Sequence, residues 1–202
     1  PPVGANLTAV AGRRMAETVA RRGGIAILPQ DIPGDVVAGV IDYEKRCHTV
    51  FETPITLASD ATIADALALI HKRAHGAVVV VDGGNPVGVF TEGDGDGFDR
   101  FTQLSNVMSS SLHILNPDID PAAAFDHLGR NRLRVAPVVD ADGRRLGVIT
   151  REGALRSTIY RPAVDADGRL MVGGAVGING DPAARAKELV GDGVDVLVID
   201  TA

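Results

Sequence analysis

The one cysteine is the strongest nucleophile that this chain offers. Cys47 stands between Arg46 and His48, whose positive charges would favour the thiolate. A catalytic thiol needs a turn that brings an acceptor to the sulfur, whereas Cys47 follows a helix-like run and nothing in the pattern places an acceptor beside it. We therefore predict that Cys47 is a linker residue.

Two groups of potential metal ligands lack the spacing that a metal site needs. Asp94 and Asp96 alternate as the ligands of a calcium loop do, but Phe98 stands where the third ligand belongs. His71 and His75 lie four positions apart near a predicted helix end, and no other ligand is clustered with them. We predict a turn at the two aspartates, solvent-exposed helix residues at the two histidines, and no metal site.

Polar residues at strand ends are the better candidates for function. Outside the central part of the chain, strands are predicted at 2–7, 25–28, 170–176 and 194–199, and helices at 13–22, 35–46 and 182–190. This alternation predicts parallel βα units, in which functional residues gather at the carboxyl ends of the strands. The candidate residues are then those at 6–8, 29–31, 177–180 and 200–202.

The central part of the chain, 53–157, is an internal repeat. Each copy contains a helix-like run, a continuous apolar run, a turn and a second apolar run; the apolar runs are 77–81 and 87–90, then 135–139 and 146–149. Thr62 or Asp60 can cap the first helix, and Asp65 would complete a capping box after Thr62. Asp120 before Pro121 predicts an N-cap on the second helix. One such unit is too small to bury its own core, so we expect the two copies to pack together.

Composition argues against several classes of partner. The 202 residues carry a formal charge of −6, only 3% are aromatic and none is Trp, so contacts to a phosphate backbone or to stacked bases are not favoured. We expect no nucleic-acid partner. No apolar stretch approaches the ~18 residues of a membrane span, and no secretory signal is recognised. A single cysteine fits a reducing compartment, so we expect a cytoplasmic protein without a membrane partner.

Both the repeat and its flanks resemble known families. The repeat resembles a tandem cystathionine-β-synthase-type (CBS) pair, or Bateman module. In the flanks the informative segments are 5–10 (Ala-Asn-Leu-Thr-Ala-Val), 22–27 (Arg-Gly-Gly-Ile-Ala-Ile), 28–31 (Leu-Pro-Gln-Asp), 174–178 (Gly-Ala-Val-Gly-Ile) and 193–202 (Gly-Val-Asp-Val-Leu-Val-Ile-Asp-Thr-Ala). These segments resemble the IMP dehydrogenase/GMP reductase family, most of all an actinobacterial, CBS-containing branch considered a GMP reductase.

This resemblance implies an α/β fold, a partial (β/α)8 TIM barrel with an inserted tandem CBS (Bateman) domain. The expected domains are a first barrel segment at 1–49, the CBS pair at 50–158 (50–109 and 110–158) and a second barrel segment at 159–202. A closed barrel of this type needs about 250 residues and eight strands. We therefore expect a piece of a longer protein, without the family's catalytic Cys loop and with no catalytic residue in this piece.

The resemblance also implies binding residues at the strand ends. Asp200, with Thr201 and Ala202, matches the family's contact with the nicotinamide-side ribose; the alternative is a helix N-cap. Ala5 and Leu7 match positions that touch the purine nucleotide, and the alternative that they only close the barrel mouth stays open.

Gln30 departs from the family pattern, which places a Lys at this position after a His where the chain has Pro29. A neutral amide stabilises developing negative charge less than an ammonium does. This difference puts in question any direct transfer of the standard reductase mechanism.

In CBS pairs, a Thr or Ser and an Asp three positions later bind adenine or guanine nucleotides. Thr91 and Asp94 match that pattern in the first copy, whereas Thr150 of the second copy is followed by Gly153 in place of the Asp. We expect one good allosteric site for ATP or GTP and one degraded or empty site. The alternative is that these are simple turn residues.

The resemblance implies NADPH-dependent reduction of GMP to IMP with release of ammonia, regulated by nucleotides at the CBS pair. The alternatives are an IMP dehydrogenase that forms XMP with NAD, and a stand-alone ATP/GTP-sensing module; a repeat that only mediates self-association is a third. The expected cofactor is NADP or NAD, and a monovalent cation is left open for the complete enzyme. A homo-oligomer, a tetramer or an octamer, is expected.

Overall fold

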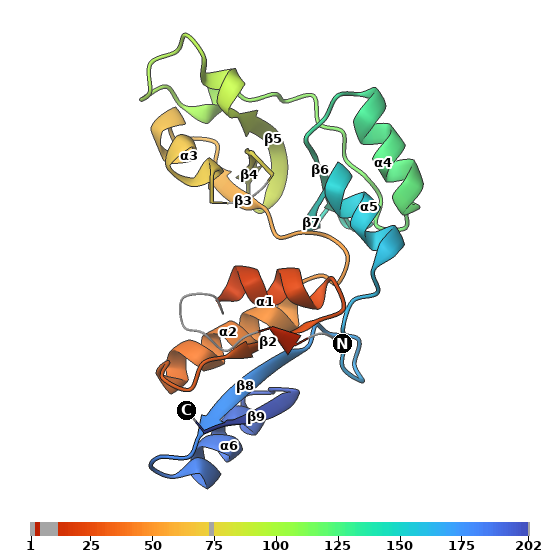
Figure 1. Ribbon diagram of the computed structural model, residues 1–202. Helices are drawn as coiled ribbons and strands as arrows, with labels where there is room; N and C mark the ends of the chain where they lie inside the picture. Colours follow the sequence, from red (N-terminus) through yellow and green to blue (C-terminus); the bar gives the residue numbers. More distant parts are fainter. Residues whose placement is uncertain (1–2, 5–11, 73–74, 202) are drawn as a thin grey trace. The chain divides into compact units, whose positions relative to one another are not determined.

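The computed structural model describes residues 3–4, 12–72 and 75–201 (Figure 1). The chain divides into two compact units. Unit 1 consists of Pro1–Val50 and Ile159–Ala202, and unit 2 is Phe51–Thr158. Unit 2 contains the internal repeat and interrupts unit 1 in the sequence.

Unit 1 is an α/β unit with a parallel sheet. Its elements in chain order are β1 (Val3–Gly4), α1 (Arg13–Ala20), β2 (Ile25–Leu28), α2 (Gly34–Arg46), β8 (Val172–Gly177), α6 (Pro182–Gly191) and β9 (Val196–Asp200). The strands pair in the order β1-β2-β8-β9, and each neighbouring pair is parallel. The carboxyl ends of the strands therefore share one edge of the sheet, as the alternating pattern predicts.

The core of unit 1 lies between the sheet and the helices α2 and α6. Leu28 of β2 and Val172 of β8 are buried together with Val37 and Ile41 of α2 and Leu189 of α6. Each such side chain contributes roughly 1.5–3 kcal/mol when it leaves water. This packing fixes the sheet against the helices and so sets the position of the strand ends.

β9 begins two residues later than its apolar run predicts. The backbone N–H of Val194 donates to the carbonyl of Leu189, and Gly193 adopts a φ of 94°. The first residues of the run are therefore used to end α6.

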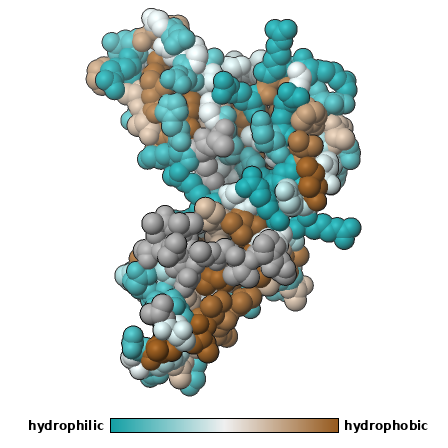
Figure 2. Space-filling view, in the orientation of Figure 1, coloured by the Kyte–Doolittle hydropathy of each residue, from teal (hydrophilic) through white to brown (hydrophobic). Residues whose placement is uncertain are grey.

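β9 lies at the edge of the described sheet and has apolar side chains in solvent. Leu197 is 38% exposed and Ile199 is 73% exposed. In the space-filling view, apolar surface gathers on unit 1 (Figure 2). An edge strand with apolar side chains is a surface that proteins normally cover with a further element.

Lys45 of α2 forms ion pairs with the part of unit 1 that follows unit 2 in the sequence. Its ammonium group lies 2.9 Å from a carboxylate oxygen of Asp165 and 2.7 Å from one of Asp195. The Asp195 carboxylate also accepts a hydrogen bond from the backbone N–H of Val172. All three charged side chains are almost fully buried, so this ion-pair cluster holds segments that are far apart in the sequence.

Unit 2 contains both copies of the repeat. The elements of the first copy are β3 (Ile55–Ala58), α3 (Ile63–Ile70), β4 (Ala77–Asp82), β5 (Asn85–Thr91) and the short 3-10 helices η1 (Glu92–Gly95) and η2 (Leu104–Asn106). Those of the second copy are α4 (Pro121–Arg130), β6 (Val135–Val139), β7 (Arg145–Thr150) and α5 (Arg151–Ile159). β4 pairs with β5, and β6 with β7, in antiparallel fashion.

The local signals in the repeat are confirmed. Thr62 and Asp65 form the capping box of α3, and the Asp120 side chain accepts from two backbone N–H groups at the start of α4. Ala77 of β4 and Val135 of β6 belong to one buried cluster, so the two copies pack against each other as expected.

The segment before each copy pairs with the last strand of the other copy. Glu52, which precedes the first copy, exchanges two backbone hydrogen bonds with Val148 of β7. Ser109, which precedes the second copy, exchanges two with Val89 of β5. Because Val89 and Val148 each stand two residues before the Thr of their copy, Glu52 and Ser109 occupy equivalent places.

Within the described ranges, no helix is long and apolar enough to cross a membrane.

Candidate functional site

Gln30 and Asp200 lie at the same edge of the unit 1 sheet. Asp200 is the last residue of β9 and pairs with Gly177 at the end of β8. The side chain of Gln30 lies against Gly177, where it fills the space that a Cβ would need. The glycine leaves room for this placement of Gln30, and Gln30 and Asp200 are both neighbours of Gly177 at this edge.

Three predicted site residues, Ala5, Leu7 and Ala202, lie outside the described residues. Thr201 is described and is exposed beside Asp200.

The first copy holds a carboxylate at the mouth of a cavity. Oδ2 of Asp94 accepts from the backbone N–H of Thr91 at 2.7 Å and from its hydroxyl at 2.8 Å. This capping box opens η1 and uses only one carboxylate oxygen in the hydrogen bonds that the described residues make. Asp94 is half-buried, so the other oxygen is available to hydroxyl donors of a ligand.

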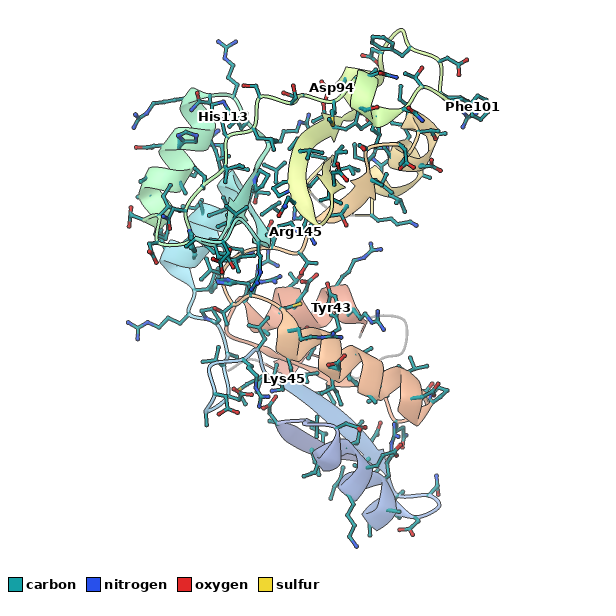
Figure 3. All side chains as sticks on the ribbon, turned by 180° about the vertical axis from the view of Figure 1, so that it is seen from behind. Tyr43, Lys45, Asp94, Phe101, His113 and Arg145 are labelled. Carbon is teal, nitrogen blue, oxygen red and sulfur yellow. The ribbon has the colours of Figure 1, made fainter. Side chains whose placement is uncertain are left out.

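The cavity beside Asp94 has a volume of about 250 Å³. It is lined by Val89, Thr91, Asp94, Ser109, Ser111, Leu112, His113, Arg132, Leu133, Arg134, Val135 and Pro137. Figure 3 labels Asp94 and His113, which come from different copies of the repeat. One cavity thus combines an apolar wall, a carboxylate and guanidinium groups. This combination suits a ligand that has an apolar part, hydroxyl groups and negative charge.

Arg132 and Arg134 are cationic residues of this cavity that the sequence motif does not include. Arg132 has a φ of 53°, the left-handed region that residues other than Gly rarely adopt, and Arg134 reaches over Gly76 of the first copy. Both lie just after α4 in the second copy, whereas the Thr–Asp motif lies in the first. In the sequence, the two arginines are marked only by their position directly before the apolar run of the second copy, and this position alone does not predict that they line the cavity.

The second copy places Thr150 at a cavity of different chemistry. This cavity, also about 250 Å³, is lined by His75, Leu133, Arg134, Thr150, Arg151 and Glu152. The Thr150 hydroxyl accepts from the backbone N–H of Gly153 at 2.9 Å, so the turn has the same form as at Thr91. Leu133 is the one apolar side chain in this lining.

The prediction of solvent-exposed helix residues is wrong for His75. α3 ends at Ile70, and His75 is only 8% exposed. Nε2 of His75 lies 2.8 Å from Oε2 of Glu52, and Arg156 lies 2.6 Å from Oε1 of the same carboxylate. Burial alone would raise the pKa of Glu52, but the hydrogen bonds and charges of these two partners lower the pKa to about 2.

Cys47 lies directly after α2, close to a buried acidic cluster. Its sulfur is 3.6 Å from Oε2 of Glu17, and Glu17 also pairs with Arg21 at 2.9 Å. Glu44 is completely buried nearby in sequence, and burial followed by the charge of Glu17 raises its pKa to about 8. A carboxylate next to a thiol does not favour a thiolate.

Among the described residues, no group of three or more His, Cys, Asp or Glu is arranged to hold a metal ion. Asp94 and Asp96 lie in and directly after the 3-10 turn η1.

Comparisons with known proteins place this geometry in a family. The family model described as IMP dehydrogenase / GMP reductase domain matches residues 1–202. The chain is 52% identical over 202 residues to proteins named GMP reductase from Mycobacterium tuberculosis and Mycobacterium bovis. It is 38% identical over 207 residues to a protein named inosine-5'-monophosphate dehydrogenase from Mycobacterium tuberculosis.

Solved structures give the same picture. A GMP reductase from Trypanosoma brucei in complex with guanosine 5'-triphosphate matches with a TM-score of 0.69 and 27% identity. Its complex with guanosine 5'-monophosphate, in a C318A form, matches with a TM-score of 0.67. These matches cover all of this chain but 50% and 44% of the two solved chains, and the chain spans 42% of the mycobacterial GMP reductases.

Proposed function

The chain belongs to the IMP dehydrogenase/GMP reductase family, and we propose that it is a segment of an oxidoreductase that reduces GMP to IMP with NADPH and releases ammonia. The observation that carries this direction is the identity over the full length of the chain, 52% to GMP reductases against 38% to IMP dehydrogenases. Because the chain spans 42% of those reductases, the proposal concerns the protein that contains it.

In this proposal unit 1 belongs to a (β/α)8 barrel, whose functional face is the carboxyl edge of the strands. Asp200, with Thr201 and Ala202, would hold the cofactor, and Ala5 and Leu7 would contact the purine. Asp200 fits this role because a half-buried carboxylate at a strand end accepts from the hydroxyls of a ribose. The nicotinamide supplies the hydride, and these residues bind and orient the two reactants.

Gln30 would face the same reactants, since its side chain and Asp200 both meet Gly177. Its amide can donate a hydrogen bond to the substrate but carries no charge. We propose that any charge developing on the purine is stabilised by residues of the longer protein and that Gln30 only positions the ligand.

The apolar face of β9 supports the same architecture. In a closed barrel each strand has a neighbour on both sides and helices cover the outer face. A further strand would pair with β9, and its helix would cover Leu197 and Ile199, which are exposed in this chain. We also propose that the complete protein is a homo-oligomer.

Unit 2 is proposed to be a CBS pair that binds a regulatory nucleotide in the cavity beside Asp94. The free oxygen of Asp94 would accept from ribose hydroxyls, the apolar wall of Val89 and Val135 would contact the base, and Arg132 and Arg134 would bind phosphate. A cavity of about 250 Å³ encloses a portion of such a ligand and leaves the rest in solvent. ATP and GTP are the candidate ligands.

The test of the proposed reaction uses the full-length protein that contains this chain. We expect GMP-dependent oxidation of NADPH with release of ammonia, and little formation of NADH from IMP and NAD. The opposite pattern would assign an IMP dehydrogenase, and absence of both signals would defeat the oxidoreductase proposal. Heat of binding for ATP or GTP without either activity would leave a sensing module as the remaining function.

A further inference from the structure

We propose that Glu52 closes the second nucleotide site from within, so that the chain binds one nucleotide, in the cavity beside Asp94. The Glu52 carboxylate takes the place of the aspartate that the second copy lacks, and His75 and Arg156 hold it there. This inference rests on the proposed role of unit 2 as a nucleotide-binding pair.

The position of Glu52 is set by backbone pairing, because the segment before each copy pairs with the last strand of the other copy. Glu52 pairs with Val148 as Ser109 pairs with Val89, so the two residues reach equivalent places beside Thr150 and Thr91. At the first site the residue is a serine that lines an open cavity. At the second site it is a glutamate, whose longer side chain reaches the Thr150 hydroxyl at 3.3 Å.

The glutamate fills the space that an aspartate of the second copy would use. A Cβ placed on Gly153 would lie 3.0 Å from Oε1 of Glu52. Gly153 is equivalent to Asp94, since each stands three residues after the Thr of its copy. The carboxylate that the sequence lacks at position 153 is thus present in space, supplied from a residue about 100 positions earlier in the chain.

Both oxygens of the Glu52 carboxylate already have partners within unit 2. Oε1 binds Arg156 at 2.6 Å, and Oε2 binds His75 at 2.8 Å as well as the Thr150 hydroxyl. Asp94, by contrast, uses only Oδ2 for Thr91. The side chain of Glu52 is 17% exposed, and those of His75 and Arg156 are 7% and 10% exposed, so a nucleotide would have to break a buried ion-pair cluster.

The two partners of Glu52 belong to the second site alone. When the copies are aligned on Thr91 and Thr150, Gly97 is the counterpart of Arg156. When they are aligned on the apolar strands β4 and β6, Leu133 is the counterpart of His75. The glutamate and its two partners therefore occur together where the aspartate is missing. The second cavity also lacks the apolar wall that a base needs, because Leu133 is its one apolar lining residue.

The cluster also ties together the two ends of the repeat. Glu52 stands before β3, where the chain enters unit 2, and Arg156 belongs to α5, where the chain leaves it. A nucleotide at the second site would separate these segments, whereas a nucleotide beside Asp94 leaves them joined.

Equilibrium dialysis of the full chain with ATP, and separately with GTP, tests the inference by counting bound nucleotides. We expect one per chain in the wild type, none in Asp94→Asn, and still one in Thr150→Val. The double variant Glu52→Ser, Gly153→Asp copies the residues of the first site into the second, and we expect it to bind two. Far-UV circular dichroism shows whether each variant is folded.

Two outcomes would overturn the inference. Two nucleotides per wild-type chain, one of which is lost in Glu52→Gln, would make Glu52 a ligand-binding residue. A folded double variant that gains no site would show that Glu52 does not close the second site. If the wild type and Asp94→Asn both bind none, the proposed regulatory function fails, and a gain of one nucleotide in the double variant still supports closure by Glu52. If the double variant does not fold, Thr150→Val decides, because loss of a nucleotide in that variant contradicts a closed second site.

Discussion

Replacing Glu44 with Gln should remove a large pH dependence from the stability of unit 1. Glu44 is 0% exposed, and neither of its carboxyl oxygens has a hydrogen-bond partner in the described part of the chain. Burial, then the charge of Glu17, raises its pKa from 4.5 to about 8, against the opposing charges of Arg21 and Lys45. Between pH 4.5 and about 8, Glu44 is therefore protonated in the folded protein and ionised in the unfolded chain.

The sign and size follow from this difference in pKa. Glu44 contributes its full stability below pH 4.5, and that contribution is lost as the pH rises towards about 8. A difference of about 3.5 pKa units corresponds to an upper limit of roughly 4–5 kcal/mol. Gln has nearly the same shape and does not titrate, so Glu44→Gln should be the more stable form at high pH.

Urea unfolding followed by far-UV circular dichroism at a series of pH values measures this effect, since the chain has no Trp to report fluorescence. The free energy of unfolding of the wild type should fall by several kcal/mol between pH 5 and 8, with a slope of at most about 1.4 kcal/mol per pH unit from this group, whereas the curve of Glu44→Gln should be much flatter. Asp42→Asn is the matched control, because Asp42 lies on the same helix and its side chain is 62% exposed. Parallel curves for wild type and Glu44→Gln would show that Glu44 does not carry a raised pKa in the folded protein.

Three further substitutions test the Lys45 ion pairs, the N-cap of α4 and the Glu52 cluster. Lys45→Met leaves the carboxylates of Asp165 and Asp195 without their buried partner and should cost about 3 kcal/mol in urea unfolding; an unchanged midpoint would contradict the cluster. Asp120→Ala removes the N-cap of α4 and should cost about 1 kcal/mol, with Ser in its place restoring most of that loss. Glu52→Gln should lower the melting temperature at neutral pH and abolish the stability loss that the wild type shows as the pH falls from 4.5 through about 2; a variant with the wild-type acid transition would show that Glu52 does not titrate in this window.

Local signals in the sequence predicted much of the fold. The alternation of apolar runs and helices indicated parallel units, and the sheet order β1-β2-β8-β9 agrees with it. The caps at Thr62 and Asp120 were correctly predicted because a cap depends on residues within one turn. The start of β9 was not, since Val194 has the composition of a strand residue but its N–H serves the end of α6.

The chemistry of the second site could not be predicted from the sequence, because it depends on pairing between the copies. Glu52 and Thr150 are about 100 positions apart, and only the backbone pairing of Glu52 with Val148 brings them together. His75 was assigned to a helix because helix ends are weakly marked in sequence. The sequence motif contains Thr91 and Asp94 but not Arg132 or Arg134, which reach the same cavity from the other copy.

The proposed function is tested by the GMP-dependent oxidation of NADPH by the full-length protein, measured while ATP or GTP is added, in the wild type and in Asp94→Asn. We expect that the wild type consumes NADPH with GMP and that an added nucleotide changes this rate. We expect the change, taken relative to each protein's own rate without nucleotide, to be lost in Asp94→Asn. A wild type that consumes no NADPH with GMP would defeat the proposed reaction, and an equal nucleotide effect in both proteins would defeat the proposed regulatory site.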